Sequence, residues 1–111
     1  MTEREVKQLI NESIDELRNY QKKALSRISN RALCENDIQE GRKLLEDILK
    51  GSLFEDNTGR EPQYESLVGE EVFEELRKEL SRTSNVVKLL KGDISPKVYE
   101  KRQLEIDEKC L

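Results

Sequence analysis

Apolar residues recur at three- and four-residue steps along most of the chain, a spacing that predicts helices rather than strands. Between Thr2 and Leu33 this pattern meets no proline and no glycine. Thr2 with Glu5 three residues later matches a capping box, which marks a helix start. We therefore predict one helix of about eight turns from Thr2 to Leu33, with a single apolar stripe. The stripe comprises Val6, Ile10, Ile14, Leu17, Leu25, Ile28 and Ala32, with Gln21 as a polar interruption.

A second helix is predicted to start at Asn36, whose side chain can cap it, and Asp37 favours the positive end of the helix dipole. Gly41 lies on its apolar stripe and costs about 1 kcal/mol of helix propensity. Close approach of another helix would offset that cost. Gly51 is predicted to end the helix in the left-handed conformation. The stripe comprises Ile38, Gly41, Leu44, Leu45, Ile48 and Leu49.

Residues 51–66 show no helical period and are predicted to form a loop. Turn-forming residues occupy 56–59 and 61–62. A short helical turn is expected at 53–54. Loops of this length are uncommon in small domains and are often functional or mobile.

A third helix is predicted from about Leu67 or Glu70 to Lys91, where Gly92 stops it. Acidic residues in its first turns favour the positive end of the dipole. Its stripe comprises Val68, Val72, Leu76, Leu80, Thr83, Val87 and Leu90, with Phe73 beside it.

The fourth helix is predicted to begin where Ser95 caps it and Pro96 takes the first helical position. It should fray near Asp107. The residues expected to face inward are Val98, Tyr99, Arg102 and Ile106.

Residues 25–30 recur at 80–85 with only Ile28 replaced, by Thr83. Each copy is predicted to lie late in a long helix that a shorter helix follows. The predicted fold is all-α: one domain over 1–111, in which two long–short helical hairpins pack as a four-helix bundle. The hairpins cover about 2–50 and 67–108. Internal duplication would explain this sequence repeat, and so would chance similarity in a chain rich in Lys, Glu, Leu and Ser.

Gly92 to Ser95, followed by Tyr99 and Glu100, resembles the short C-terminal helical hairpin of bacterial proteins known as the SHOCT type. A glycine turn, a Ser or Thr cap and an aromatic–Glu pair recur in that motif. The resemblance covers about 20 residues, and any capped helix after a glycine turn shares much of the pattern. It implies local architecture and no function.

Composition agrees with solvated helices: charged residues are 40 % of the chain and hydrophobic residues 34 %. The formal net charge of −4 gives no overall attraction to nucleic acid or anionic lipid. No apolar run is long enough to span a membrane, and the first residues lack the apolar region of a secretion signal. A cytoplasmic location without membrane association is therefore expected.

The residue types argue against catalysis. The chain has no histidine, which excludes Ser–His and Cys–His nucleophile pairs and the commonest metal ligand. Cys34 and Cys110 lack zinc-site spacing and are expected to be free thiols. Residues 56–61 fail the calcium-loop pattern. No catalytic residue, cofactor or metal is predicted, and one acidic cluster is interpreted as a solvated first turn. That cluster comprises Glu70, Glu71, Glu74 and Glu75.

Residues 17–34 hold five basic side chains and no acidic one, and 80–92 are likewise basic only. Functionally, the first segment could bind phosphate backbones or an acidic groove of a protein. Structurally, cations late in a helix complement its dipole and can pair with acidic turns of the other hairpin. The candidate partner-binding stripe comprises Arg18, Lys22, Lys23, Arg27 and Arg31.

The favoured hypothesis is a non-catalytic protein–protein interaction module, acting as a regulator, adaptor or inhibitor and self-associating or held in a complex. A helix of about 30 residues spans roughly 45 Å, which exceeds the body of a compact domain of this size. Part of its stripe would then need cover from a protein partner or a second copy. The alternative is a nucleic-acid-associated regulator that uses the basic stripe. The acidic net charge and the few aromatic residues count against it.

Overall fold

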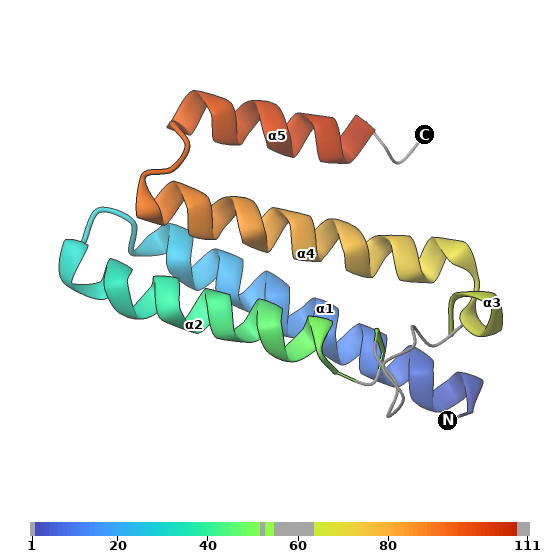
Figure 1. The fold of residues 1–111 in the computed structure, drawn as a ribbon. Coiled ribbons are helices and arrows are strands. Elements are labelled where there is room, and N and C mark those ends of the chain that lie inside the picture. The colour runs from blue at the N-terminus through green and yellow to red at the C-terminus, as the bar shows by residue number, and fades with distance from the viewer. Residues whose placement is uncertain (1, 52, 55–63, 109–111) are drawn as a thin grey trace.

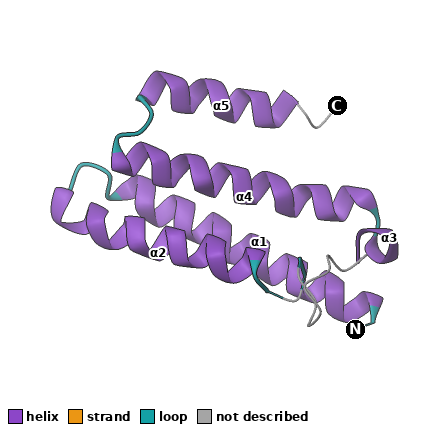
Figure 2. Cartoon of the chain, in the orientation of Figure 1, coloured by secondary structure: helices purple, strands orange, loops and turns teal. Residues whose placement is uncertain are grey.

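The computed structural model describes residues 2–51, 53–54 and 64–108, and every regular element in these ranges is an α-helix (Figures 1 and 2). The all-α prediction is confirmed for the described residues. The helices are α1 (Glu3–Ser26), α2 (Arg31–Leu49), α3 (Tyr64–Val68), α4 (Glu70–Lys91) and α5 (Pro96–Glu108).

The first helix is shorter than predicted. It ends at Ser26, a turn follows, and Asn30 caps α2 by accepting a hydrogen bond from the Ala32 N–H at 3.1 Å. A continuous helix to Leu33 and a cap at Asn36 are therefore both wrong. An asparagine supplies the helix break here without any proline or glycine, and the apolar spacing continues through the turn and hides it.

α4 is the central element. It packs against α1, α2, α3 and α5, whereas α5 contacts α4 alone among the described helices. Figure 1 shows α1, α2 and α4 running side by side, with α5 lying along α4. The described chain measures 43 × 31 × 21 Å along its principal axes. The fold thus has a three-helix centre and one helix attached to a single neighbour.

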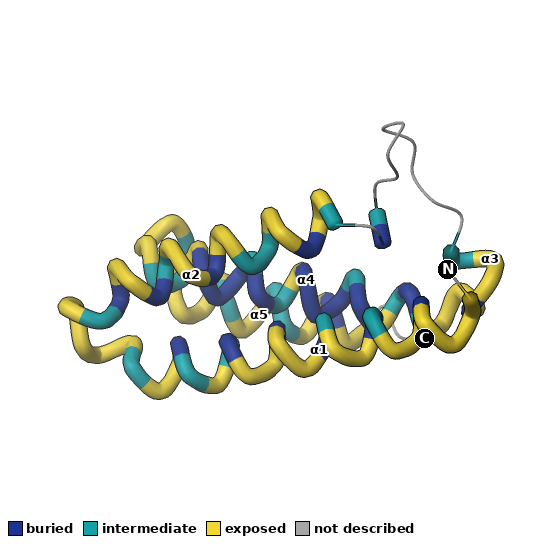
Figure 3. The backbone as a smooth tube through the Cα atoms, turned by 90° about the horizontal axis from the view of Figure 1, so that it is seen from below, coloured by how far each residue is buried: buried dark blue, intermediate teal, exposed yellow. Residues whose placement is uncertain are grey.

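Buried residues recur along α1 from Val6 to Ala24 (Figure 3). The prediction that a long stripe projects beyond the domain is therefore wrong. Leu25 and Ile28 were placed on the stripe but are 37 % and 40 % exposed, and Ile28 lies in the turn after the helix. The buried residues of α1 are Val6, Ile10, Ile14, Leu17, Tyr20 and Ala24.

Gly41 allows the close approach that its position predicted. The neighbour is the Tyr20 side chain of α1, and a Cβ at position 41 would overlap the Tyr20 ring. The Tyr20 hydroxyl donates a hydrogen bond to the Asp37 carbonyl oxygen at 2.5 Å, which satisfies a polar group in the buried contact. The second core cluster forms around this ring and comprises Tyr20, Ala24, Val86 and Val87.

The end of α4 follows the sequence closely. Gly92 is left-handed, with φ 80°, and the Asp93 N–H donates to the Lys88 carbonyl at 2.9 Å. Ser95 then caps α5 by accepting from the Val98 N–H at 3.2 Å. The predicted caps at Gly92 and Ser95 are confirmed, as is the position of Pro96.

Two details differ from the predictions. Val98 does not face inward, since it is 39 % exposed, whereas Ile106 is buried. Gly51 is not left-handed: Gly69 and Gly92 are the glycines with positive φ among the described residues. α2 instead ends through Lys50 in a right-handed conformation.

The predicted loop contains one helix that the pattern did not indicate. α3 begins at residue 64, inside the predicted 51–66 loop, while 53–54 form the expected turn. The turn-forming residues within 56–62 lie outside the described residues. The two copies of the sequence repeat also differ in structure: residues 25–30 span the end of α1 and the following turn, whereas residues 80–85 lie inside α4.

Candidate functional site

The five residues of the predicted basic stripe divide into two groups. Arg18, Lys23 and Arg27 form ion pairs within the chain, whereas Lys22 and Arg31 are exposed and form no ion pair with the described residues. In a single long helix, Arg31 would share one face with Lys23 and Arg27. Arg31 instead begins α2, so it does not lie on that face. The expected pairing with the other hairpin is found for Arg18, whose partner Glu79 lies on α4. Lys23 and Arg27 instead pair with α2 of their own hairpin.

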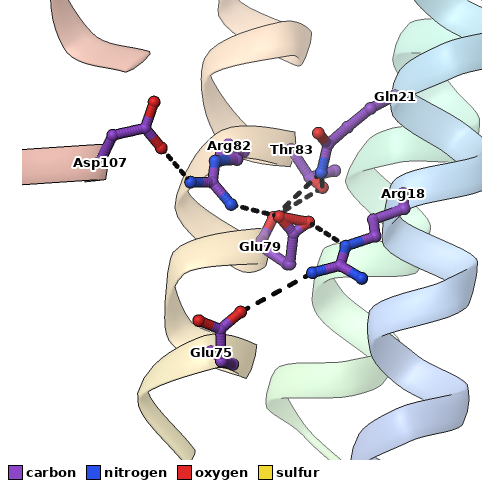
Figure 4. Close-up of polar contacts among 7 residues, drawn as sticks. All are labelled: Arg18, Gln21, Glu75, Glu79, Arg82, Thr83 and Asp107. Atoms are coloured by element: carbon purple, nitrogen blue, oxygen red, sulfur yellow. Dashed lines mark hydrogen bonds and ion pairs between the residues drawn. The ribbon is translucent and has the colours of Figure 1, made fainter. Parts of the chain in front are cut away.

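Arg18 pairs with Glu79 of α4, which is only 2 % exposed (Figure 4). The Arg18 Nε donates to Glu79 Oε2 at 3.2 Å, and the Arg82 Nη1 donates to Glu79 Oε1 at 2.6 Å. A buried carboxylate is costly unless it is paired and hydrogen-bonded. Two guanidinium groups, one from each side, meet that requirement for Glu79.

The pairing extends from Glu79 to a third helix. Arg82 also binds Asp107 of α5, and Arg18 reaches Glu75 at 3.7 Å (Figure 4). Burial alone would lower the pKa of Arg82, but its hydrogen bonds to Glu79 and Asp107 outweigh burial and raise that pKa. This network therefore joins α1, α4 and α5.

A neutral contact lies beside the network. The Gln21 side chain, a polar interruption in the apolar stripe, donates to Thr83 Oγ1 at 3.0 Å. The Thr83 hydroxyl donates in turn to the Glu79 carbonyl oxygen at 2.8 Å. Gln21 therefore serves the α1–α4 contact and not a binding surface.

A second buried carboxylate, Asp37, holds the α1–α2 turn. It is fully buried, and Arg27 binds it through two nitrogens, with the Nε at 3.2 Å from Oδ2. Lys23 pairs with Glu40 one turn further along α2. Burial, followed by the charges of Asp37 and Glu40, raises the pKa of Tyr20. These contacts fix the turn from inside.

Exposed residues at and beside this turn make up the candidate surface. Lys22, Leu25, Ile28 and Arg31 follow one another at three-residue intervals around the turn, and all four are exposed. We call these four residues the turn patch. It combines two large aliphatic side chains with one cation before them and one after them. Such a surface suits a partner that offers both apolar and acidic groups.

The remaining exposed large apolar residues are distributed over other elements: Leu49 on α2, Leu67 on α3, and Val98 and Leu104 on α5. Single exposed apolar residues are ordinary on soluble proteins. The turn patch differs because its two aliphatic residues are close in sequence and flanked by charges of one sign.

The part of the chain that the structure describes contains no group of three or more His, Cys, Asp or Glu residues placed to hold a metal. Cys34 is a buried free thiol whose Sγ lies 3.4 Å from the Ile28 carbonyl oxygen. Cys110 lies outside the described residues. None of the described helices combines the length and apolar character needed to cross a membrane.

Sequence reasoning did not identify Glu79 and Asp37 as buried. Glu79 lies in a helix rich in acids, and its partner Arg18 is 61 positions away. No local spacing marks such a pair. Asp37 and Arg27 are ten positions apart, with Asp37 inside α2 and Arg27 at the turn after α1, so their pairing becomes visible only once that turn is known.

Comparison of the chain with protein-family models, curated proteins and solved structures finds no match. The resemblance of residues 92–100 to the SHOCT-type hairpin therefore rests on those residues alone. Any proposal for a function depends on the surface of this chain.

Proposed function

We propose that this protein is a helical protein–protein interaction module that binds its partner through the turn patch. The observation that carries the proposal is the exposure of Leu25 and Ile28 between the exposed cations Lys22 and Arg31. The turn patch would recognise a partner by surface contact, and we assign no catalytic step to it.

The support beneath the patch favours binding. Asn30 caps α2, Arg27 binds buried Asp37, and the Cys34 Sγ contacts the Ile28 carbonyl oxygen. These contacts hold the backbone of the turn before any partner arrives. A surface that is already ordered loses less conformational entropy on binding, which increases affinity.

The size of the patch limits what it can do alone. Full burial of a Leu or Ile side chain stabilises by about 1.5–3 kcal/mol. Leu25 and Ile28 are already more than half covered, so a partner would gain about 1 kcal/mol from each. The partner must therefore make further contacts, and acidic groups facing Lys22 and Arg31 are the expected ones.

A protein partner is favoured over nucleic acid. Arg18, Lys23 and Arg27 are held by carboxylates of the chain itself, which leaves Lys22 and Arg31 as the cations of the stripe that form no ion pair with the described residues. Affinity for a phosphate backbone depends on the number of phosphates that cations neutralise. Two exposed cations beside two aliphatic side chains suit an acidic protein surface better.

The test compares cross-linked complexes from host cells, quantified by mass spectrometry, for the wild type and two variants. Leu25→Gln/Ile28→Gln removes the apolar part of the patch, and Leu104→Gln is the matched control on exposed α5. The expected result is a set of proteins retained by the control and reduced at least tenfold with the double variant. Equal recovery with all three chains would exclude the turn patch.

The nucleic-acid alternative is tested with Lys22→Glu/Arg31→Glu, which leaves the Arg27–Asp37 pair intact. Nucleic-acid binding that weakens steeply with salt and disappears in this variant would replace the protein proposal. Arg27 should not be reversed in this test, because its loss would leave Asp37 buried without a partner.

The two-hairpin arrangement and the internal duplication remain part of the proposal. The order of helices, α1–α2 and then α4–α5, and the near-identity of 25–30 and 80–85 support them. The different local structures of the two copies weigh against duplication. The burial of the α1 stripe also removes the original reason for expecting self-association.

A further inference from the structure

α5 is attached to the described part of the molecule through one neighbour. It contacts α4 and no other described helix, and residues 92–95 connect the two. Figure 1 shows α5 folded back along α4 after this short connection. A helix that packs on one element through a short hinge has the geometry in which copies of a chain can exchange a helix.

The contact between α4 and α5 is specific. Arg82 binds Asp107, and the Arg102 Nη1 donates to Asn85 Oδ1 at 3.4 Å. Tyr99 packs against the core cluster that contains Val86. α4 therefore presents a face that recognises the polar and aromatic positions of α5.

The same contact is modest in apolar content. Ile106 is the buried residue of α5, and Leu104 is 63 % exposed on its outer side. The Gln103 Oε1 is buried without a hydrogen-bond partner, which costs free energy in the closed arrangement. Release of α5 is therefore much easier than unfolding of the three-helix centre.

We propose that α5 is an exchangeable arm: in a second state, α5 of each of two copies occupies the α4 face of the other. The occupant of this face is a second copy of the chain, because its α5 carries the same Asp107, Arg102 and Tyr99 that the face already binds. Every α4–α5 contact is remade in the dimer, so the balance depends on the hinge and on concentration. The proposal concerns a surface other than the turn patch.

The hinge is held closed by identifiable contacts. Gly92 has φ 80°, the Asp93 N–H donates to the Lys88 carbonyl, and Lys91 pairs with Asp93 at 3.2 Å. The open hinge would be extended and not helical, because Pro96 lacks an N–H and disfavours helical conformation at Ser95. Position 92 therefore controls the balance between the two states.

The test is light scattering after size exclusion from micromolar to millimolar concentration. Because residue 92 is left-handed in the closed hinge, Gly92→Ala should shift the equilibrium between the closed and the open hinge about tenfold towards the open hinge. Two hinges open per dimer, so the dissociation constant of the dimer should fall about 100-fold if the open hinge is unstrained. Gly69→Ala is the matched control, since Gly69 also has positive φ, 97°, and lies away from the hinge.

A mixture of two variants identifies the contact used. Gly92→Ala/Asp107→Arg and Gly92→Ala/Arg82→Glu each carry like charges where Arg82 meets Asp107, both in the closed monomer and in a dimer of identical chains. A mixed dimer restores opposite charges at both contacts, so mixing the two chains should give more dimer than either chain alone. Gly92→Ala/Leu25→Gln/Ile28→Gln should keep the dimer of Gly92→Ala. If Gly92→Ala does not fold, deletion of Asp93 and Ile94 shortens the hinge and should give the same dimer. A monomer for every variant at all concentrations would overturn the proposal, as would a mixture that forms no more dimer than its two separate chains.

Discussion

α4 meets the rest of the molecule on two sides, and the two contacts differ in kind. Towards α1 and α2 it presents buried apolar residues such as Leu76 and Leu80. Towards α5 it presents Arg82 and Asn85, which bind polar partners. Apolar burial dominates folding free energy, whereas a partly exposed ion pair contributes little. One helix therefore carries both the stability of the centre and a separable attachment.

The largest expected effect comes from a substitution on the side of α4 that packs against α1 and α2. Leu76→Ala should lower the free energy of unfolding by about 3–4 kcal/mol, because Leu76 is fully buried and a cavity would remain. Chemical denaturation followed by circular dichroism measures the change. Leu104→Ala, on the outer side of α5, should stay within about 0.5 kcal/mol of the wild type. Similar losses for both would contradict the assignment of stability to the centre.

The next effect tests the network between the two sides. Glu79→Ala should cost about 2 kcal/mol, since it leaves Arg82 partly buried without its main partner, although Arg18 can still be solvated. Glu75→Ala removes a half-exposed partner of Arg18 and should cost about 0–0.5 kcal/mol. Equal stability of the two variants in the same denaturation experiment would show that Glu79 is not an essential partner.

Tyr20 gives the centre a dependence on high pH. Burial, then the charges of Asp37 and Glu40, raises the pKa of Tyr20 above its ordinary value of 10.0. Above about pH 10 the unfolded chain loses this proton while the folded chain keeps it. The resulting stabilisation is complete below that pH and falls as pH rises. Tyr20→Phe should cost about 1 kcal/mol at neutral pH and show a weaker fall in alkaline unfolding titrations.

The smallest effect concerns the attachment of α5. Asp107→Asn should change global stability by about 0.5 kcal/mol, because Asp107 is 61 % exposed. Hydrogen exchange should nevertheless become faster in α5 while exchange in α1 stays unchanged. Matching changes in both helices would mean that α5 and the centre open as one unit.

The parts of the fold that sequence predicted correctly are those with local causes. The stripe through Leu76 and Leu80, the glycine stop at Gly92 and the Ser95 cap each depend on residues within one or two turns. The missed break at Asn30 also has a local cause. However, Leu25 and Ile28 keep the helical spacing up to it, so periodicity alone could not show where the helix ends.

The candidate site was predicted only in part, for a related reason. Five cations in an acid-free segment indicated a stripe, but three of them find carboxylates through tertiary contacts with other helices. Which cations stay exposed depends on where α2 and α4 lie, and sequence spacing does not contain that information. Lys22 and Arg31 were identified from the sequence as part of the stripe. The sequence did not show that Arg27 is paired with a carboxylate while these two are not.

The contact between Tyr20 and Gly41 reverses a common rule of stabilisation. Replacing a glycine inside a helix by alanine usually adds up to about 1 kcal/mol through backbone entropy. At position 41 the added methyl group would displace the Tyr20 ring and break its hydrogen bond to the Asp37 carbonyl. Position 41 therefore has the lowest helix propensity in α2 and is also the position where a substitution to raise that propensity is least tolerated. The space left by the missing Gly41 side chain is filled by the Tyr20 ring of α1.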